Sequence, residues 1–139
     1  MSLHLKIITP LSTVLDEEVS SIRLVAETGE MEVLPGHADM ITALDNGELI
    51  YRPVGGASQS LFIGGGFLQV EHDLAMLVTD MAVQEGQINQ EEIEAAIARA
   101  REYQSKHQPS LSREELARLE AIIAQQLAAL EYNRRKRRR

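Results

Sequence analysis

The hydrophobic periodicity of this chain changes once, near residue 85, and that change constrains the fold more than any other feature of the sequence. Before it, apolar residues recur at every second position, which is typical of half-buried β-strands. After it, they recur at steps of three and four residues, which is typical of amphipathic helices. We therefore expect two structural units, residues 1–86 and residues 87–139.

The first unit contains a series of short candidate strands separated by turn-forming residues. Leu3, Leu5 and Ile7 alternate with His4 and Lys6, as expected for a strand with one buried face. Segments rich in Gly, Pro, Asn and Asp lie between the candidate strands, which span residues 3–7, 19–26, 31–34, 40–44, 48–52, 60–63, 67–71 and 74–78. Strands at this spacing, with no helical pattern between them, predict an antiparallel β-sandwich of about 8–10 strands.

The second unit carries the signals of two helices. Asn89 is a candidate N-cap with Glu92 three residues later, and the first helix is expected to end near Gln104. Ser112 and Glu115 have the same capping-box spacing at the start of the second helix. Together they predict an antiparallel two-helix hairpin, so the chain belongs to the α+β class. Because its apolar faces are rich in Ala, each contact buries little area and the hairpin should be movable.

The two units differ in charge. Residues 1–87 contain 3 Lys or Arg against 13 Asp or Glu, a net charge of -10, whereas residues 88–139 contain 11 against 8, a net charge of +3. The basic run at residues 134–139 repels itself, so we expect it to be disordered until it meets an acidic partner. The overall charge of -7 and the lack of aromatic residues interleaved with the run favour a protein partner over nucleic acid.

The sequence offers little catalytic chemistry. The chain has no Cys, and its four His residues are scattered, so surface histidines are favoured over a zinc site built from His4, His37 and His72. The Gly64–Gly66 run precedes a strand rather than a helix, which favours a bulge or a close approach of strands over a phosphate-binding loop. We therefore expect no catalytic residue, no metal and no cofactor. We also expect no bilayer-spanning segment and no export signal.

Two stretches are more specific. Residues 29–38 read Gly-Glu-Met-Glu-Val-Leu-Pro-Gly-His-Ala, and residues 62–70 read Phe-Ile-Gly-Gly-Gly-Phe-Leu-Gln-Val. They resemble the two signature stretches of the epsilon subunit of rotary (F-type) proton-translocating ATP synthases. The resemblance extends to the opening strand at residues 3–11, the end of the sandwich at residues 77–80 and the two C-terminal helices, so it covers essentially the whole chain.

This resemblance implies a non-catalytic rotor subunit of the central stalk, which couples ion translocation to ATP synthesis. Its sandwich would bind the gamma subunit and the c-subunit ring, and its mobile hairpin would inhibit ATP hydrolysis by contacting the beta and alpha subunits of the catalytic head. The loop facing the ring would consist of Glu30, Met31, Glu32, Pro35, Gly36 and His37. The regulatory contacts with beta or gamma would come from Arg113, Arg118, Arg134, Arg135, Lys136 and Arg137. The resemblance implies a peripheral protein, bound through the complex to the cytoplasmic face of a bacterial plasma membrane or the stromal face of a thylakoid membrane.

Two segments depart from the family pattern. Glu32 replaces a usual Gly, which makes the loop more acidic. In members that bind ATP on the hairpin, an Asp and an Arg stand where this chain has Asn89 and Glu92, so we expect weak or no ATP binding. On physical grounds alone, the pattern also fits a stand-alone β-sandwich binding module with a helical dimerisation hairpin. A metal-dependent enzyme built on the sandwich fits it less well.

Overall fold

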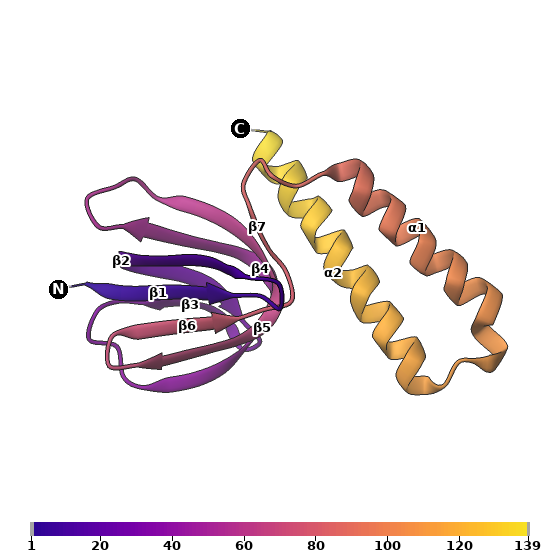
Figure 1. Cartoon of the computed structure of the whole chain (residues 1–139), viewed down its shortest axis with the longest axis horizontal. Coiled ribbons are helices and arrows are strands. Elements are labelled where there is room, and N and C mark those ends of the chain that lie inside the picture. Colours follow the sequence, from indigo (N-terminus) through magenta and orange to yellow (C-terminus); the bar gives the residue numbers. More distant parts are fainter. Residues whose placement is uncertain (1, 139) are drawn as a thin grey trace. The chain divides into compact units, whose positions relative to one another are not determined.

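The computed structural model describes residues 2–138, and the chain divides into two compact units, Met1–Glu85 and Gly86–Arg139. Among the described residues, the first unit is built from β-strands and the second from helices (Figure 1). The predicted α+β class, with a β-sandwich followed by a helical hairpin, is confirmed.

The strands of the first unit form one sheet that closes on itself like a flattened barrel. The sheet order is β1-β6-β5-β4-β2-β3, β7 pairs with β5, and β1 also pairs with β2 to close the ring. β2 pairs with β1 along its first half and with β3 along its second half, always antiparallel. The strand bounds are β1 (Leu3–Ile8), β2 (Thr13–Ala26), β3 (Gly29–Val33), β4 (Met40–Pro53), β5 (Gln59–Glu71), β6 (Leu74–Val78) and β7 (Ala82–Gln84).

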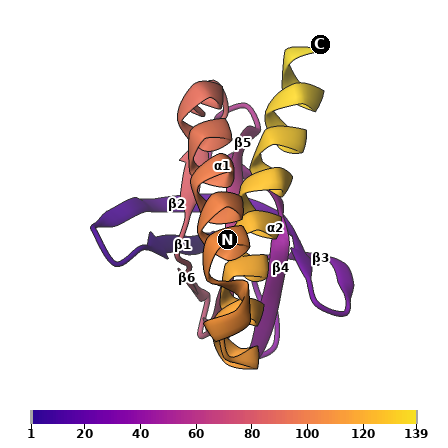
Figure 2. The same ribbon diagram turned by 90° about the vertical axis from the view of Figure 1, so that its right-hand side faces the viewer.

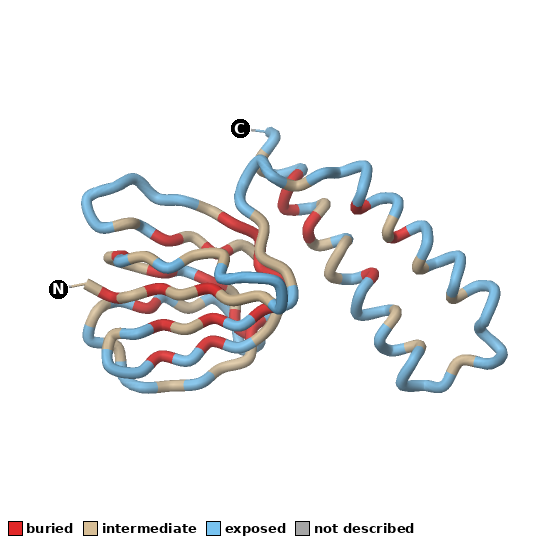
Figure 3. The backbone as a smooth tube through the Cα atoms, in the orientation of Figure 1, coloured by how far each residue is buried: buried red, intermediate tan, exposed pale blue. Residues whose placement is uncertain are grey.

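The core of the first unit lies between the inner faces of these strands. Buried and partly exposed residues alternate along β1, as the sequence predicted, because successive side chains of a strand point to opposite faces (Figure 3). Leu3, Leu5 and Ile7 are fully buried in the same cluster as Leu68 and Leu77. This inward packing sets the register of β1, since a slip by one residue would expose all three side chains.

The predicted strand count was wrong because two pairs of expected strands are continuous. β4 runs through residues 45–47 and β5 runs through Gly64–Gly66, which merges the eight expected segments into six. β7, which was not expected, brings the count within residues 2–138 to seven. The two irregular segments lie opposite each other, with Leu44 paired to Gly66 and Asn46 paired to Gly64, so pairing continues past both. The antiparallel description also fails at one place, since β1 and β6 are parallel.

Gly66 on β5 lies very close to the backbone at the end of β6. Its φ is +118°, and a Cβ at this position would lie 2.0 Å from the backbone oxygen of Val78 and 2.9 Å from Thr79 Cα. Only glycine fits a backbone of this shape and this proximity. The expectation of a close strand approach in the glycine run is therefore confirmed.

The second unit is a hairpin of α1 (Gln90–His107) and α2 (Arg113–Arg137), joined through the short 3-10 helix η1 (Gln108–Ser110). The two α-helices lie side by side and run in opposite directions (Figures 1 and 2). Both predicted N-caps are present. The Asn89 side chain accepts a hydrogen bond from the Glu92 backbone N–H at 3.1 Å, and Ser112 Oγ accepts one from the Glu115 N–H at 3.1 Å.

Two predicted helix ends were wrong. α1 continues three residues past Gln104, where the stacked rings of Tyr103 and His107 support its last turn. α2 continues through Arg137, although the basic run was expected to be disordered. Basic side chains at a helix C-terminus interact favourably with the unpaired carbonyls and the helix dipole, which offsets their mutual repulsion. Arg139 belongs to the predicted run but lies outside the described residues.

Candidate functional site

The loop after β3 contains a tight turn built on Pro35 and Gly36. The His37 backbone N–H donates to the Leu34 carbonyl at 3.1 Å, and Gly36 has a φ of +85°. Pro35 and Gly36 thus occupy the two central positions of a type II turn, where proline presets φ and glycine accepts a positive value. We call residues 34–37 the PG turn.

A second turn holds the PG turn in place. His72 and Asp73 join β5 to β6 with φ values of 49° and 60°, as in a two-residue type I′ hairpin. The Gly36 N–H donates to Asp73 Oδ1 at 2.7 Å, and the His72 N–H donates to Asp39 Oδ1 at 3.2 Å. The 72–73 turn therefore accepts a hydrogen bond from the PG turn and donates one to Asp39, two residues after it, and both bonds restrict the position of the loop.

The residues nominated for the loop do not all face the same way. Glu30 and Glu32 on β3 are exposed, whereas Met31 between them packs against the core. Leu34, which was not nominated, is 49% exposed at the start of the PG turn. The His37 Nδ1–H donates to the Ala38 carbonyl at 2.7 Å, which orients the ring. The surface presented is therefore formed by two carboxylates, Leu34 and the backbone of the turn.

The six nominated basic residues fall into two groups on α2. Arg113 and Arg118 are exposed near its start, and Arg134, Arg135, Lys136 and Arg137 lie at its end. At a rise of 1.5 Å per residue, Arg118 and Arg134 are separated by roughly 24 Å along the helix, so they cannot form one contact site. Arg118 lines a small cleft of about 160 Å³ with Tyr103, Leu111, Leu119, Ile122 and Glu115.

The basic end of α2 is held by specific contacts. Arg134 Nε and Nη2 donate to the two carboxylate oxygens of Glu131 at 2.9 and 2.5 Å, and this hydrogen bonding holds the pKa of Glu131 below its usual value. Lys136 Nζ lies 5.7 Å from the centre of the Tyr132 ring. Arg137 Nη1 donates to Gln90 Oε1 on α1 at 3.0 Å, which ties the two helices together at the open end of the hairpin.

Asn89 and Glu92, which stand where ATP-binding relatives have an Asp and an Arg, lie at the start of α1. Asn89 caps α1 through its side-chain oxygen, which engages the Glu92 N–H. The Glu92 side chain lines an open cleft of about 510 Å³ with Arg99 and Gln126. Glu92 and Arg99 place one negative and one positive side chain in this cleft, so its lining has no net positive charge to attract a phosphate group.

The histidines considered for zinc do not converge. His4 contacts Asp16 and Glu18, His37 contacts Ala38, and His72 lies near Glu71. Residues 2–138 contain no group of three or more His, Cys, Asp or Glu side chains arranged to hold a metal ion. Within the same residues, no helix is both long enough and apolar enough to cross a bilayer.

Comparisons with known proteins agree with the architecture. The family model described as "ATP synthase, Delta/Epsilon chain, beta-sandwich domain" matches residues 2–85. The chain is 36% identical over 130 residues to the ATP synthase epsilon chain of Geotalea uraniireducens, covering 91% of this chain and 94% of that protein. It is 34% identical over 129 residues to the ATP synthase epsilon chain of Geobacter metallireducens, covering 91% and 93% of the two proteins.

Two solved assemblies contain chains of similar structure. A chain of the Euglena gracilis mitochondrial ATP synthase, determined as OSCP/F1/c-ring, matches with a TM-score of 0.66 and 28% identity, covering 93% of this chain and 81% of that chain. A chain of the Tetrahymena thermophila mitochondrial ATP synthase, determined as central stalk and c-ring, matches with a TM-score of 0.53 and 16% identity, covering 68% and 72%. The second likeness shows the fold alone.

Proposed function

Because the chain belongs to the family of ATP synthase epsilon chains, non-catalytic subunits of a membrane-associated complex, we propose that it is a rotor subunit of the central stalk. In this role, residues 1–86 bind the gamma subunit and the c-subunit ring, and coupling of ion translocation to ATP synthesis passes through these contacts. Residues 87–139 regulate the catalytic head. Family membership favours this role over the stand-alone binding module and over a metal-dependent enzyme.

The PG turn and the exposed edge of β3 are the proposed contact with the c ring. The observation that supports this best is the pair of hydrogen bonds from Gly36 to Asp73 and from His72 to Asp39, which restrict the loop before any partner binds. A contact surface whose geometry is already fixed loses less conformational entropy on binding. The exposed carboxylates of Glu30 and Glu32 favour a partner loop that carries basic side chains.

A matched pair of variants tests the loop contact in the assembled complex. Glu32→Gly restores the residue usual in the family and removes one carboxylate from the exposed edge, so we expect altered affinity for the c ring. Glu27→Gly removes an exposed carboxylate before the β3 strand and serves as the control. Equal affinities of both variants and the parent chain for purified c ring would contradict a contact through Glu32.

The hairpin is proposed to inhibit ATP hydrolysis through its two basic groups on α2. Exposed Arg113 and Arg118 would engage an acidic segment of the beta subunit, and residues 134–137 would extend this contact toward beta or gamma. The Ala-rich helix faces and the small set of buried residues in α1, Ile93 and Ile97, support a hairpin that can be displaced. The attraction of exposed charges should weaken as salt concentration rises.

Removal of residues 87–139 tests this regulation directly. We expect the truncated chain to assemble with gamma and the c ring, and the complex to hydrolyse ATP faster than the complex with the full chain. Unchanged hydrolysis would reject an inhibitory hairpin. Within the full chain, Arg118→Gln should raise hydrolysis, whereas Arg101→Gln, at an exposed position on α1 outside the proposed contact, should not.

A crosslinking experiment locates the hairpin. The chain has no Cys, so Arg118→Cys introduces a single thiol. Crosslinks to the beta subunit with one nucleotide condition and to residues 1–86 with another would support a hairpin that changes position. Identical crosslinks in every nucleotide condition would contradict it.

We propose that the hairpin binds ATP weakly or not at all. Support comes from Glu92, which stands where the motif has an Arg and offsets the charge of Arg99 in the same cleft, and from Asn89, whose side chain caps the helix. Calorimetric titration of the full chain with ATP should give no measurable heat at micromolar concentrations. An affinity in the low-micromolar range would overturn this proposal.

We also propose that the complex places this chain on the cytoplasmic face of a bacterial plasma membrane, or on the stromal face of a thylakoid membrane. The bacterial relatives of similar length support the first location. Protease digestion of inverted and right-side-out membrane vesicles tests it, because only inverted vesicles should expose the chain.

A further inference from the structure

The seam that closes the barrel contains a polar cluster with no place in the proposed contacts. β1 pairs antiparallel with β2 on one side and parallel with β6 on the other, so it joins the two ends of the sheet. His4 lies on the outer face of β1, directly opposite Glu18 on β2 and beside Leu74 on β6. Its side chain is 33% exposed.

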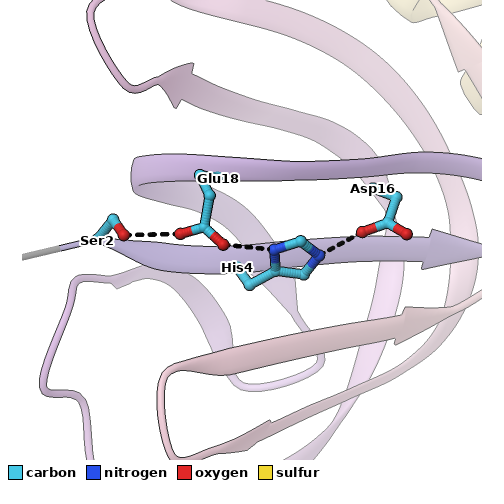
Figure 4. A network of polar contacts seen from close by, with 4 residues as sticks. All are labelled: Ser2, His4, Asp16 and Glu18. Atoms are coloured by element: carbon cyan, nitrogen blue, oxygen red, sulfur yellow. Dashed lines mark hydrogen bonds and ion pairs between the residues drawn. The ribbon is translucent and has the colours of Figure 1, made fainter.

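Both nitrogens of the His4 ring contact carboxylates. Nδ1 lies 2.6 Å from Glu18 Oε1, and Nε2 lies against Asp16 Oδ1 (Figure 4). Ser2 Oγ donates to the other Glu18 oxygen at 2.6 Å. An ionised carboxylate only accepts hydrogen bonds, so both ring nitrogens must carry hydrogen, and His4 must be the charged imidazolium.

The charges around the ring agree with this assignment. The hydrogen bond to Glu18 raises the pKa of His4 most, and the bond to Asp16 raises it further. Burial lowers this pKa, but by less, so the pKa of His4 lies above its ordinary value. Lys6 lies next along the same face of β1, opposite Asp16. On the β6 side the neighbours of β1 are Leu74 and Met76, and the carboxylate of Asp73 is engaged by the Gly36 N–H.

The backbone of His4 is connected to the PG turn. The His4 N–H donates to the Asp73 carbonyl at 2.8 Å, and Asp73 Oδ1 accepts from the Gly36 N–H at 2.7 Å. A shift of β1 at His4 therefore displaces the residue that holds the turn. Asp73 is the only residue in this path between the two elements.

We propose that His4, Asp16 and Glu18 form a proton-dependent clasp across the β1–β2 seam, and that opening the clasp at alkaline pH loosens the PG turn through Asp73. A neutral imidazole has one N–H and one lone pair, so it can donate to only one of the two carboxylates. The other carboxylate then faces a lone pair and moves away, which releases the outer edge of β1. The clasp stands independently of the proposed function, and only its effect on the c-ring contact rests on that proposal.

The pH range follows from the direction of the pKa shift. The folded-state pKa of His4 is above the ordinary value of 6.5, so the clasp is complete below that value and is lost as pH rises through the raised pKa. Solvent partly screens this half-exposed ion pair, so losing it should have a modest effect. We expect the exchange rate of the Gly36 amide to rise roughly two- to fivefold more than base catalysis of exchange alone would raise it.

Nuclear magnetic resonance of the full chain tests the clasp. The His4 ring should titrate above the ordinary histidine value of 6.5, and the Gly36 amide shift should follow the His4 midpoint. His4→Gln should abolish this response of Gly36. His4→Lys, which keeps a positive charge to higher pH, should move the response upward. His107→Gln, on α1 in the second unit, should leave it unchanged.

Two results would overturn the clasp: a His4 midpoint at or below the ordinary value of 6.5, or a Gly36 amide that does not respond near the His4 midpoint. If His4→Gln fails to fold, Glu18→Gln removes one partner while keeping the ring, and it should lower the His4 midpoint. These measurements use the isolated chain, so their failure leaves the stalk assignment intact. Binding to purified c ring across the same pH range then tests the functional step separately.

Discussion

The close approach of β5 and β6 at Gly66 predicts a large cost for adding one methyl group. Gly66 and Gly29 have nearly the same positive φ, +118° and +126°, but their surroundings differ. A Cβ at Gly66 would meet the Val78 oxygen at 2.0 Å, whereas a Cβ at Gly29 would have nothing within 4 Å. Alanine at the two positions therefore separates backbone strain from steric overlap.

Backbone strain and steric overlap set the expected loss of unfolding free energy at each position. Gly29→Ala should cost about 1–3 kcal/mol of unfolding free energy, the usual cost of a non-glycine residue in a sparsely populated backbone region. Gly66→Ala adds overlap with backbone atoms that cannot rotate away, which should raise the cost by a further 1–3 kcal/mol or more. The partners at risk are the Phe67–Val78 and Leu68–Leu77 pairs of the β5–β6 ladder.

Urea unfolding of the full chain provides the assay. The methyl resonances of Leu68 and Leu77, which are fully buried in the first unit, report on the sandwich without interference from the helices. At a slope of roughly 1–1.5 kcal/mol per molar urea for a unit of this size, the two midpoints should differ by about 1–2 M. Equal midpoints for Gly66→Ala and Gly29→Ala would refute the steric argument.

Three further predictions concern single contacts. Asp73→Asn keeps a residue that tolerates a left-handed backbone, but the acceptor of the Gly36 N–H loses its charge. The free energy that protects the Gly36 amide from exchange should therefore fall by about 1 kcal/mol. Asp80→Asn should not change it. Ser112→Ala should cost the hairpin about 1 kcal/mol in thermal melts followed at 222 nm, whereas Ser105→Ala inside α1 should stabilise it. Hydrogen bonds to Ser2 and His4 lower the pKa of Glu18 from its ordinary value of 4.5. The ionised Glu18 carboxylate therefore stabilises the fold above pH 4.5, and this contribution should be lost as pH falls through the lowered pKa. Glu18→Gln should remove this acid dependence from the unfolding curves.

The local signals of the sequence were sufficient for the features that depend on a few neighbouring residues. Asn89 and Ser112 cap their helices as predicted, because a cap needs only a side-chain acceptor and a donor three residues later. The turn at Pro35 and Gly36 was predictable for the same reason, since two residues fix its backbone angles. The α+β class followed from the change of period near residue 85.

Features that depend on distant partners were not predictable from local patterns. Glycines in residues 45–47 and 64–66 looked like chain breaks, but each segment is paired with the other, so both strands continue. Asp73 looked like an ordinary turn residue, yet it holds Gly36 from 37 positions away. His4 was considered as a zinc ligand, and only the register of β1 with β2 shows that it faces two carboxylates.

The basic end of α2 is ordered, although its sequence predicted disorder. Repulsion among consecutive Arg and Lys residues predicts disorder when the residues are considered alone. In the hairpin, Glu131 engages Arg134 and Gln90 engages Arg137, and the helix end itself attracts positive charge. The local sequence shows the repulsion among these residues, but it does not show the contacts that the preceding helical turn and α1 provide.

The position of β1 between β2 and β6 has a consequence for how the chain folds during synthesis. β1 meets β2 soon after both are made, but its pairing with β6 joins His4 to Leu74, about 70 residues later. Until β6 emerges, β1 presents an unpaired edge that is open to association with other chains. β1 is synthesised well before β6, yet it cannot complete its hydrogen bonds until β6 has been made, and such a non-local step slows folding. A ribosome that stalls before Leu74 would leave a chain with most of its strands and an open barrel, which is a form prone to aggregation.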